Sequence, residues 1–165
     1  ALIPSAVLVP LVDRPGGMTV ILTQRADTLP DHAGQISFPG GRVEPDDQGP
    51  EATALRETQE EIGLDPSFIQ VVGRMADYET GSGFCIVPVV ALVREGFSLT
   101  PEPAEVAEVF EVPLAFVLDA ANHVRESALF RGVQRHFFVL PYQDRRIWGA
   151  TAGLLVQLAH RLGAV

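Results

Sequence analysis

Three glutamates and one arginine lie within six residues of each other, in a segment that reads as a helix. Pro50 suits the first turn of this helix and Gly63 suits its C-terminal cap, so we expect a helix from Pro50 to Ile62. At about 100° per residue, four charged side chains share one arc of roughly 140°: Arg56, Glu57, Glu60 and Glu61. Leu55 and Ile62 lie opposite, which predicts that they face the core and that the carboxylates face solvent.

The chemistry that this arrangement suits is the binding of a divalent cation. Like charges three and four residues apart repel, at a cost of a few tenths of a kcal/mol per pair. Carboxylate oxygens are the ligands that Mg²⁺ and Mn²⁺ prefer. Two glycines at the end of the preceding loop, Gly40 and Gly41, would let the backbone approach the helix closely enough for a carbonyl to serve as a further ligand. For the helix considered alone, a solvated acidic face is the alternative.

Alternating apolar runs and turn residues predict the elements around this helix. Ala6–Val12 and Thr19–Thr23 are expected to form an opening hairpin. Further strands are expected at Ile69–Met75, Phe84–Val93 and Arg135–Tyr142, and further helices from Leu114 to Ala121 and at Gly149–Leu162. The stretch from Arg25 to Pro50 is expected to be loop-like, interrupted only by the short run Ile36–Phe38. Pro88 predicts that its strand lies at an edge or contains a bulge. The order of elements indicates one domain over residues 1–165, an α/β or α+β sandwich with a mixed sheet.

The composition restricts the class of protein. A chain of 165 residues that is 47% hydrophobic and 20% charged is typical of a compact domain. Its net charge of −9 disfavours nucleic acid as a partner, and an anionic substrate would need a bound cation, local arginines or backbone N–H groups. The single Cys85 excludes an internal disulfide. Because no apolar run approaches the roughly 20 residues that span a bilayer, we expect no membrane partner and a cytoplasmic location.

The helix and the loop before it resemble the signature box of the Nudix hydrolases. Gly41, the pair Arg56-Glu57, the pair Glu60-Glu61 and Gly63 follow each other in the order of that box. The resemblance implies a Nudix-type α/β/α sandwich that hydrolyses a nucleoside diphosphate linked to another group. The interval from Gly41 to Arg56 is one residue longer than usual, and the acid in the middle of the box is replaced within 44–48. We expect the missing glutamate to weaken a supporting role and to leave the helix ligands intact.

The segment Leu22–Gly41 resembles the coenzyme A pyrophosphatase branch of that family, as do Glu111–Leu114 and Ile147–Ala152. This implies that the substrate is a small-molecule nucleotide, coenzyme A or acyl-CoA. Its hydrolysis would give adenosine 3′,5′-bisphosphate and 4′-phosphopantetheine. Another nucleoside diphosphate derivative, such as ADP-ribose or NADH, and a non-catalytic nucleotide sensor are the alternatives. The oligomeric state stays open.

The resemblance also implies roles for single residues. Glu57, Glu60 and Glu61, with the Gly40 carbonyl, would hold Mg²⁺ or Mn²⁺, and Arg56 would orient Glu57. A later acid is expected to contribute, with Glu108 as the first choice among three candidates, unless these acids only form a solvated face: Glu105, Glu108 and Glu111.

Arg25 and Arg42 flank the loop and are candidates for contact with a substrate phosphate, with an ordinary surface position as the alternative. His32 and Gln35 are candidates for contact with the substrate or for shaping the loop. Guanidinium groups suit contacts with phosphate. Trp148 is expected in the core, with a base-stacking role as the alternative.

Overall fold

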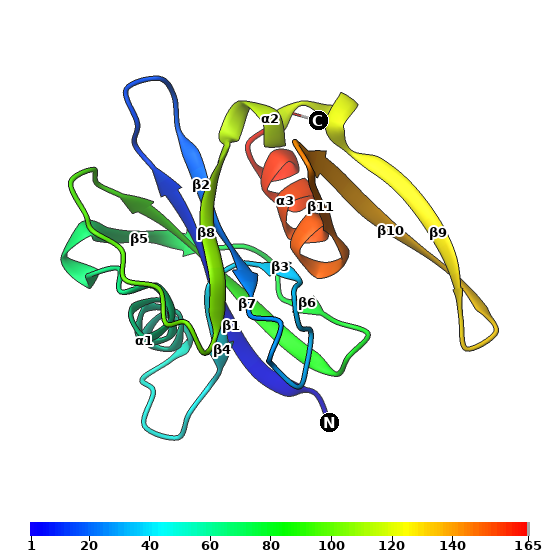
Figure 1. Cartoon of the computed structure of the whole chain (residues 1–165), viewed down its shortest axis with the longest axis horizontal. Helices are drawn as coiled ribbons and strands as arrows, with labels where there is room; N and C mark the ends of the chain where they lie inside the picture. The colour runs from blue at the N-terminus through cyan, green and yellow to red at the C-terminus, as the bar shows by residue number, and fades with distance from the viewer. Residues whose placement is uncertain (165) are drawn as a thin grey trace.

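The computed structural model describes residues 1–164 as two sheets and three α-helices (Figure 1). The larger sheet contains β1 (Ile3–Val12), β2 (Thr19–Arg25), β3 (Ile36–Ser37), β4 (Gly40–Arg42), β5 (Ile69–Arg74), β6 (Tyr78–Glu79), β7 (Phe84–Val93) and β8 (Val106–Pro113). The smaller sheet contains β9 (Val124–Phe130), β10 (Val133–Tyr142) and β11 (Arg145–Trp148). The helices are α1 (Pro50–Ile62), α2 (Leu114–Leu118) and α3 (Gly149–Arg161), with 3₁₀ turns at Pro66–Phe68 and Ala120–Asn122.

The larger sheet is mixed, as the sequence predicts. Its central path runs in the order β3-β2-β1-β7-β5, and β4, β6 and β8 pair with β1, β7 and β2. Strands β1 and β7 are parallel along their whole length, from Ile3 opposite Phe84 to Val12 opposite Val93, and the other pairs are antiparallel. The hairpin of β1 and β2 is confirmed by the pairing of Leu11 with Val20.

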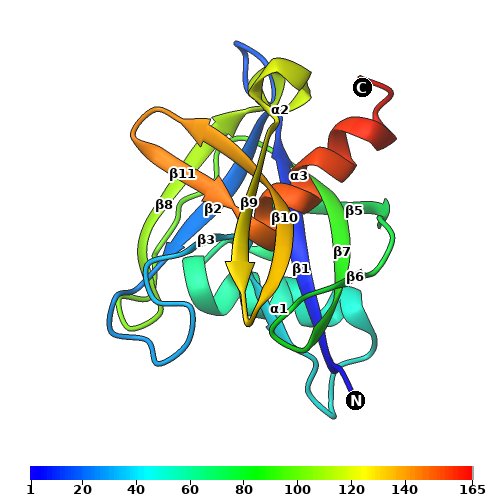
Figure 2. The same ribbon diagram turned by 90° about the vertical axis from the view of Figure 1, so that its right-hand side faces the viewer.

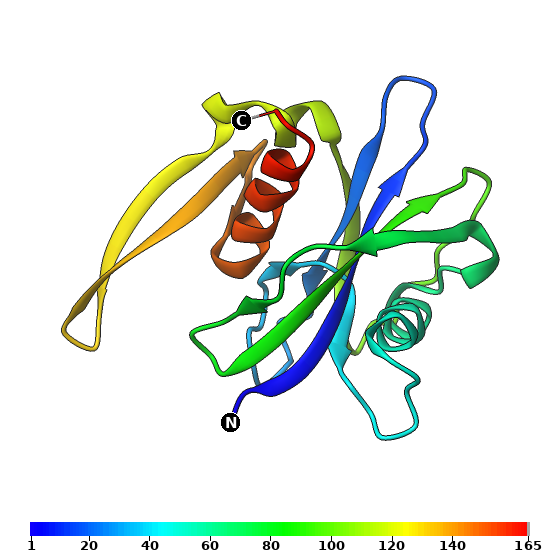
Figure 3. The same cartoon turned by 180° about the vertical axis from the view of Figure 1, so that it is seen from behind.

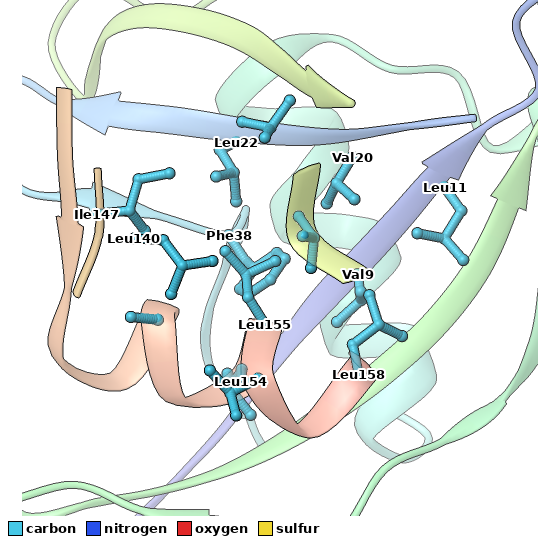
Figure 4. Packing of buried hydrophobic residues seen from close by; sticks show 14 of the residues in the cluster. Val9, Leu11, Val20, Leu22, Phe38, Leu140, Ile147, Leu154, Leu155 and Leu158 are labelled. Atoms are coloured by element: carbon cyan, nitrogen blue, oxygen red, sulfur yellow. The ribbon is translucent and has the colours of Figure 1, made fainter. Parts of the chain in front are cut away.

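Helices α1 and α3 cover opposite faces of the larger sheet, which confirms the α/β/α layering (Figures 1 and 3). The main core fills the space between this sheet, α3 and the smaller sheet (Figure 4). Phe38 and Leu155 lie at its centre, between Leu22 of β2 and Leu140 of β10. On the other face, Ala54 of α1 packs in a cluster of small and branched side chains, so α1 lies close to β1 and β7.

Helix α1 has the predicted bounds, and Gly63 caps it in the left-handed conformation at φ 69°. Its predicted buried face is partly wrong. The fully buried positions are centred on Ala54, Thr58 and Ile62, whereas Leu55 is only half-buried. Because the buried arc is rotated towards Glu61, this glutamate is turned into the protein.

One expectation about the strands differs from the structure, and two strands were not predicted. Strand β7 lies between β1 and β5 rather than at an edge; Pro88 sits where the outer partner of β7 changes from β5 to β6, so its missing N–H interrupts no ladder there. The acidic segment before Pro113 forms β8, and residues 124–130, for which no element was predicted, form β9. No helix among residues 1–164 has the length and apolar character needed to cross a membrane.

Candidate active site

The glutamates of α1 meet the glycines of β4. The Gly40 N–H donates a hydrogen bond to Glu61 Oε2 at 3.0 Å. A Cβ atom on Gly41 would lie 2.6 Å from Glu57 Cδ, and one on Gly40 would lie 2.3 Å from the Ala6 carbonyl oxygen. Only residues without a side chain fit here, so the two glycines allow β4 to lie between β1 and the carboxylates of α1.

The three glutamates have very different exposure. Glu61 is 6% exposed, which corrects the expectation that it faces solvent, and Glu57 is half-buried. The Glu60 side chain is 56% exposed. The three carboxylates therefore range from buried at Glu61, through half-buried at Glu57, to exposed at Glu60.

Burial makes the inner carboxylates hard to ionise. Burial, with the neighbouring charges of Glu57 and Glu105, raises the pKa of Glu61 to about 8, although the Gly40 N–H and Arg25 act in the opposite direction. Burial also raises the pKa of Glu57, against the effect of its bond with Arg56. A bound cation would favour the charged forms of both groups.

Arg56 joins α1 to the loop before it. Its Nε donates to Asp47 Oδ1 at 3.0 Å and its Nη2 donates to Asp47 Oδ2 at 2.9 Å. Its Nη1 donates to Glu57 Oε1 at 2.9 Å, as predicted, and a longer contact of 3.4 Å reaches Glu60. These bonds lower the pKa of Asp47, helped by the Glu44 N–H and the Thr53 hydroxyl.

Asp47 therefore supplies an acid to Arg56, and the expectation that the missing glutamate weakens a supporting role stays a prediction. The signal in the sequence was the acidic segment 44–48, which contains Asp47.

The acids after β7 divide into two groups. Glu105 is close enough to raise the pKa of both Glu57 and Glu61. Glu108, the first choice from the sequence, instead accepts a hydrogen bond from Arg145 Nη2 at 2.5 Å. Glu111 is paired with Arg14 and Thr19. The placement moves the preference from Glu108 to Glu105, whose role stays a prediction.

The two arginine candidates for substrate contact lie in different surroundings. Arg25 lies near Glu61, and its Nε is buried without a hydrogen-bond partner among the described residues, whereas its Nη2 donates to the Asp31 carbonyl. The Arg42 guanidinium lies over the Phe84 ring at 5.5 Å, and no contact joins it to the carboxylates in the part of the chain that the structure describes.

His32 and Gln35 shape the loop between β2 and β3. His32 adopts a left-handed backbone at φ 54°, and its carbonyl accepts a hydrogen bond from the Gln35 N–H at 3.2 Å. Gln35 also lines a pocket that Trp148 borders. Trp148 is 41% exposed, so the expectation that it lies in the core is wrong.

The donor set fits a divalent cation. Within residues 1–164, no three acidic, histidine or cysteine side chains are already grouped as a metal cage. The fit comes from the chemistry of the half-buried Glu57 and the buried Glu61, two carboxylates close to each other that offer hard oxygen donors, and from the Gly40 and Gly41 backbone that lies against them. Glu60 and the Gly40 carbonyl stay predicted ligands.

Comparisons with known proteins agree with the fold. The model of the NUDIX domain matches residues 2–131. A protein of Photorhabdus laumondii named uncharacterized Nudix hydrolase NudL is 40% identical over 158 residues, which are 96% of this chain and 84% of that protein. A Yersinia pestis protein of the same name is 37% identical over 96% of this chain and 79% of its own length.

Solved structures extend the likeness to the C-terminal elements. The NUDIX domain of Shewanella oneidensis NrtR, complexed with ADP ribose, is similar over 98% of this chain and 89% of that chain, with a TM-score of 0.61 and 20% identity. The Nudix hydrolase RenU of M. smegmatis covers 68% of this chain and 71% of its own, with a TM-score of 0.58 and 25% identity. With the family model matched over most of its length, the chain belongs to the NUDIX domain family.

Proposed function

We propose that this protein is a metal-dependent Nudix hydrolase that cleaves the diphosphate of coenzyme A or acyl-CoA. Water adds across the phosphoanhydride, and the products are adenosine 3′,5′-bisphosphate and 4′-phosphopantetheine. The observation that carries the proposal is the meeting of Glu57, Glu61 and Arg25 beside the Gly40-Gly41 backbone. A nucleotide sensor of the same fold would have no need of buried carboxylates that repel each other.

The carboxylates suit a bound Mg²⁺ or Mn²⁺, held by Glu57, Glu60 and Glu61 with the Gly40 carbonyl. Such an ion supplies Lewis-acid stabilisation of the phosphates and lowers the pKa of water. Arg56 fixes the direction of Glu57 through its hydrogen bond to Oε1, so that Glu57 is available as a ligand or as the acceptor of the proton from the attacking water. Arg25 lies near Glu61, and its guanidinium group would suit a phosphate oxygen of the substrate.

The choice of coenzyme A rests on Leu22–Gly41. This segment resembles the coenzyme A branch, and it leads from β2 through the loop to β4, so its two ends contribute Arg25 and Gly40 to the site. ADP-ribose is the strongest competitor, because the NrtR domain that shares this fold is complexed with it.

Product identification tests the proposal. The wild-type chain would be incubated with CoA, acetyl-CoA, ADP-ribose and NADH, each with Mg²⁺ or Mn²⁺, and the products identified by mass spectrometry. We expect the highest kcat/KM with a CoA species, and in ¹⁸O water the label would identify the phosphorus that is attacked. Faster hydrolysis of ADP-ribose or NADH would overturn the coenzyme A assignment and leave the Nudix chemistry; binding without hydrolysis of any compound would favour a sensor.

Glu61→Gln tests the carboxylates directly, with Glu79→Gln as its matched control. Glu61→Gln removes a buried carboxylate, and we expect its turnover to fall by orders of magnitude. Glu79 is an exposed glutamate of β6, so we expect Glu79→Gln to lose little turnover. Near-wild-type turnover of Glu61→Gln at saturating Mg²⁺ would remove Glu61 from the proposed ligands.

A further inference from the structure

A pocket of about 420 Å³ lies at the seam between the larger sheet and the smaller sheet. Its lining comes from β2, the loop before β3, the start of β3, strand β8, and β11 with the turn before it, and includes Gln24, Gln35, Glu108, Asp144, Arg145 and Trp148. Figure 2 shows β11 beside β2 and β3. Its volume is within the range of small-molecule sites.

Trp148 provides the large aromatic surface of this seam pocket. The indole makes an edge contact with Phe137, with ring centroids 5.8 Å apart at 62°. The Arg146 guanidinium lies 5.5 Å from the centre of the indole. These contacts hold the ring although 41% of the residue is exposed. An exposed but fixed tryptophan at the mouth of a pocket suits the stacking of a flat ring.

Hydrogen bonds across the seam hold its two walls together. Arg145 donates to Glu108 of β8 at 2.5 Å and to Gln24 of β2 at 3.4 Å, and its guanidinium lies 3.8 Å from the centre of the Phe110 ring. Next to Trp148, the hydroxyl of Thr151 donates to the Ile36 carbonyl at 2.9 Å. The seam pocket is therefore formed in the free protein.

The polar groups of the pocket suit a heterocyclic base better than a phosphate. Glu108 and Asp144 bring two carboxylates, and Arg145 and Arg146 are already paired with Glu108 and Glu126. A phosphate would therefore meet little unpaired positive charge. The Gln35 amide can donate and accept, which matches the alternating donors and acceptors at the edge of a base.

The seam pocket lies close to the carboxylates along two chain segments. Gln24 lines the pocket, and the next residue, Arg25, acts on Glu61. Glu108 lines the pocket, and Glu105, three residues earlier, acts on Glu57 and Glu61. Three extended residues span on the order of 10 Å. A nucleotide bridges such a distance between its base and its diphosphate.

We propose that the seam pocket binds the heterocyclic base of the nucleoside diphosphate substrate, with the base stacked on Trp148. This inference rests on the proposed function, because it assigns the position of one part of that substrate. It makes Trp148 a binding residue and Arg145 a residue that positions the pocket wall.

The single tryptophan of the chain makes the inference directly measurable, because all tryptophan fluorescence comes from this pocket. The wild-type chain would be titrated with adenosine 5′-monophosphate in EDTA, so that neither a metal nor a hydrolysable diphosphate is present. We expect saturable quenching. Ribose 5-phosphate, which has the phosphate and no base, should cause none.

Variants locate the binding, with calorimetry as the readout. In Trp148→Ala the Kd for adenosine 5′-monophosphate should rise roughly 5- to 140-fold, the equivalent of about 1–3 kcal/mol for one stacked base. Trp148→Phe should keep most of the affinity, because it keeps a ring. The matched control is Phe130→Ala, which removes an exposed aromatic side chain from the β9 hairpin and should leave the Kd unchanged. Unquenched fluorescence, or an equal Kd in Trp148→Ala, would overturn the inference.

The outcomes separate this inference from the proposed function. If CoA species are hydrolysed but kcat/KM is the same in wild type and Trp148→Ala, the inference fails and the function stands. If adenosine 5′-monophosphate binds in a Trp148-dependent way while no CoA species is hydrolysed, the inference stands and the proposed function fails.

Discussion

Asp47 and Arg56 form an ion pair with two parallel hydrogen bonds, of 3.0 Å and 2.9 Å, between a loop and a helix. Because Asp47 holds Nε and Nη2, the guanidinium has Nη1 left for Glu57 Oε1 at 2.9 Å. Two-point pairing fixes the plane of the guanidinium, and this plane fixes the direction of the carboxylate. Asp47 thus acts on Glu57 through Arg56, as a positioning residue.

This relay, the hydrogen bonds that join Asp47 to Arg56 and Arg56 to Glu57, predicts the effect of Asp47→Asn. The amide cannot accept both hydrogen bonds from Arg56, so Glu57 would lose its fixed orientation. We expect kcat to fall about 10- to 100-fold, as is usual for groups that orient metal ligands, and the Mg²⁺ concentration for half-maximal activity to rise. Steady-state kinetics over a range of Mg²⁺ concentrations would measure both effects.

Asp47→Glu is the rescue variant, because its carboxylate can again pair with Arg56. It should recover more kcat than Asp47→Asn at equal thermal stability. Equal kcat in wild type and Asp47→Asn would contradict the relay.

The raised pKa of Glu61 predicts an unusual dependence of stability on pH. Its pKa is about 8 in the folded protein, against an ordinary value of 4.5. Between these values the folded state keeps a proton that the unfolded state releases, so the free energy of unfolding falls as pH rises through that window. In EDTA, Glu61→Gln should therefore melt higher than wild type at pH 8 and nearly equally at pH 5. The difference should be on the order of a few kcal/mol.

Two further measurements make the pH prediction specific to Glu61. Glu60→Gln changes an exposed carboxylate of the same helix, so its melting temperature should follow that of wild type across the same pH range. Mg²⁺ that binds the charged form should raise the melting temperature of wild type at pH 8 more than that of Glu61→Gln. Parallel melting curves of wild type and Glu61→Gln from pH 5 to pH 8 would disprove the raised pKa.

Substitution of the two glycines of β4 should have two different effects: a loss of activity at Gly41 and a loss of stability at Gly40. In Gly41→Ala the new Cβ meets the end of the Glu57 side chain, which can move, so we expect kcat to fall on the order of 10²-fold with little loss of stability. In Gly40→Ala the new Cβ meets the Ala6 carbonyl oxygen and Val7 Cα, which are backbone atoms. The cost of such overpacking is about 1–3 kcal/mol or more.

Kinetics and thermal unfolding of the two variants would be compared. If Gly41→Ala were as unstable as Gly40→Ala and retained its kcat, the prediction that its new Cβ displaces only the Glu57 side chain would be contradicted.

Local patterns predicted the elements whose ends carry their own signals. Pro50 and Gly63 define both ends of α1, and the turn residues after Val12 predicted the hairpin of β1 and β2. Strand β8 was missed because its alternation includes the charged residues Glu108 and Glu111, which pair with Arg145 and Arg14 from distant segments. A pairing between residues that lie far apart in the sequence leaves no local pattern.

The candidate site, too, has features that local sequence patterns predict and features that depend on distant contacts. The order of Arg56, Glu57 and Glu61 in the sequence is enough to predict that they meet, but not that Glu61 is buried, because burial depends on how α1 is rotated against β1 and β7. Trp148 was expected in the core from its residue type alone. It is exposed because it lies with Phe137 and Arg146 on the face of the strand opposite to the buried Ile147.

Glu105 and Glu108 lie three residues apart, and the structure predicts a different kinetic effect when each is neutralised. Glu105 acts on Glu57 and Glu61, so Glu105→Gln should lower kcat and, by removing a repelling charge, lower the pKa of Glu61. The fall of stability with pH would then occur at lower pH than in wild type.

Glu108→Gln should loosen Arg145 in the wall of the seam pocket, so it should raise KM and leave kcat nearly unchanged. Steady-state kinetics and melting curves in EDTA from pH 5 to pH 8 would distinguish the two variants. If kcat fell in Glu108→Gln and not in Glu105→Gln, Glu108 would be the acid that works with the carboxylates of α1, as the sequence first suggested.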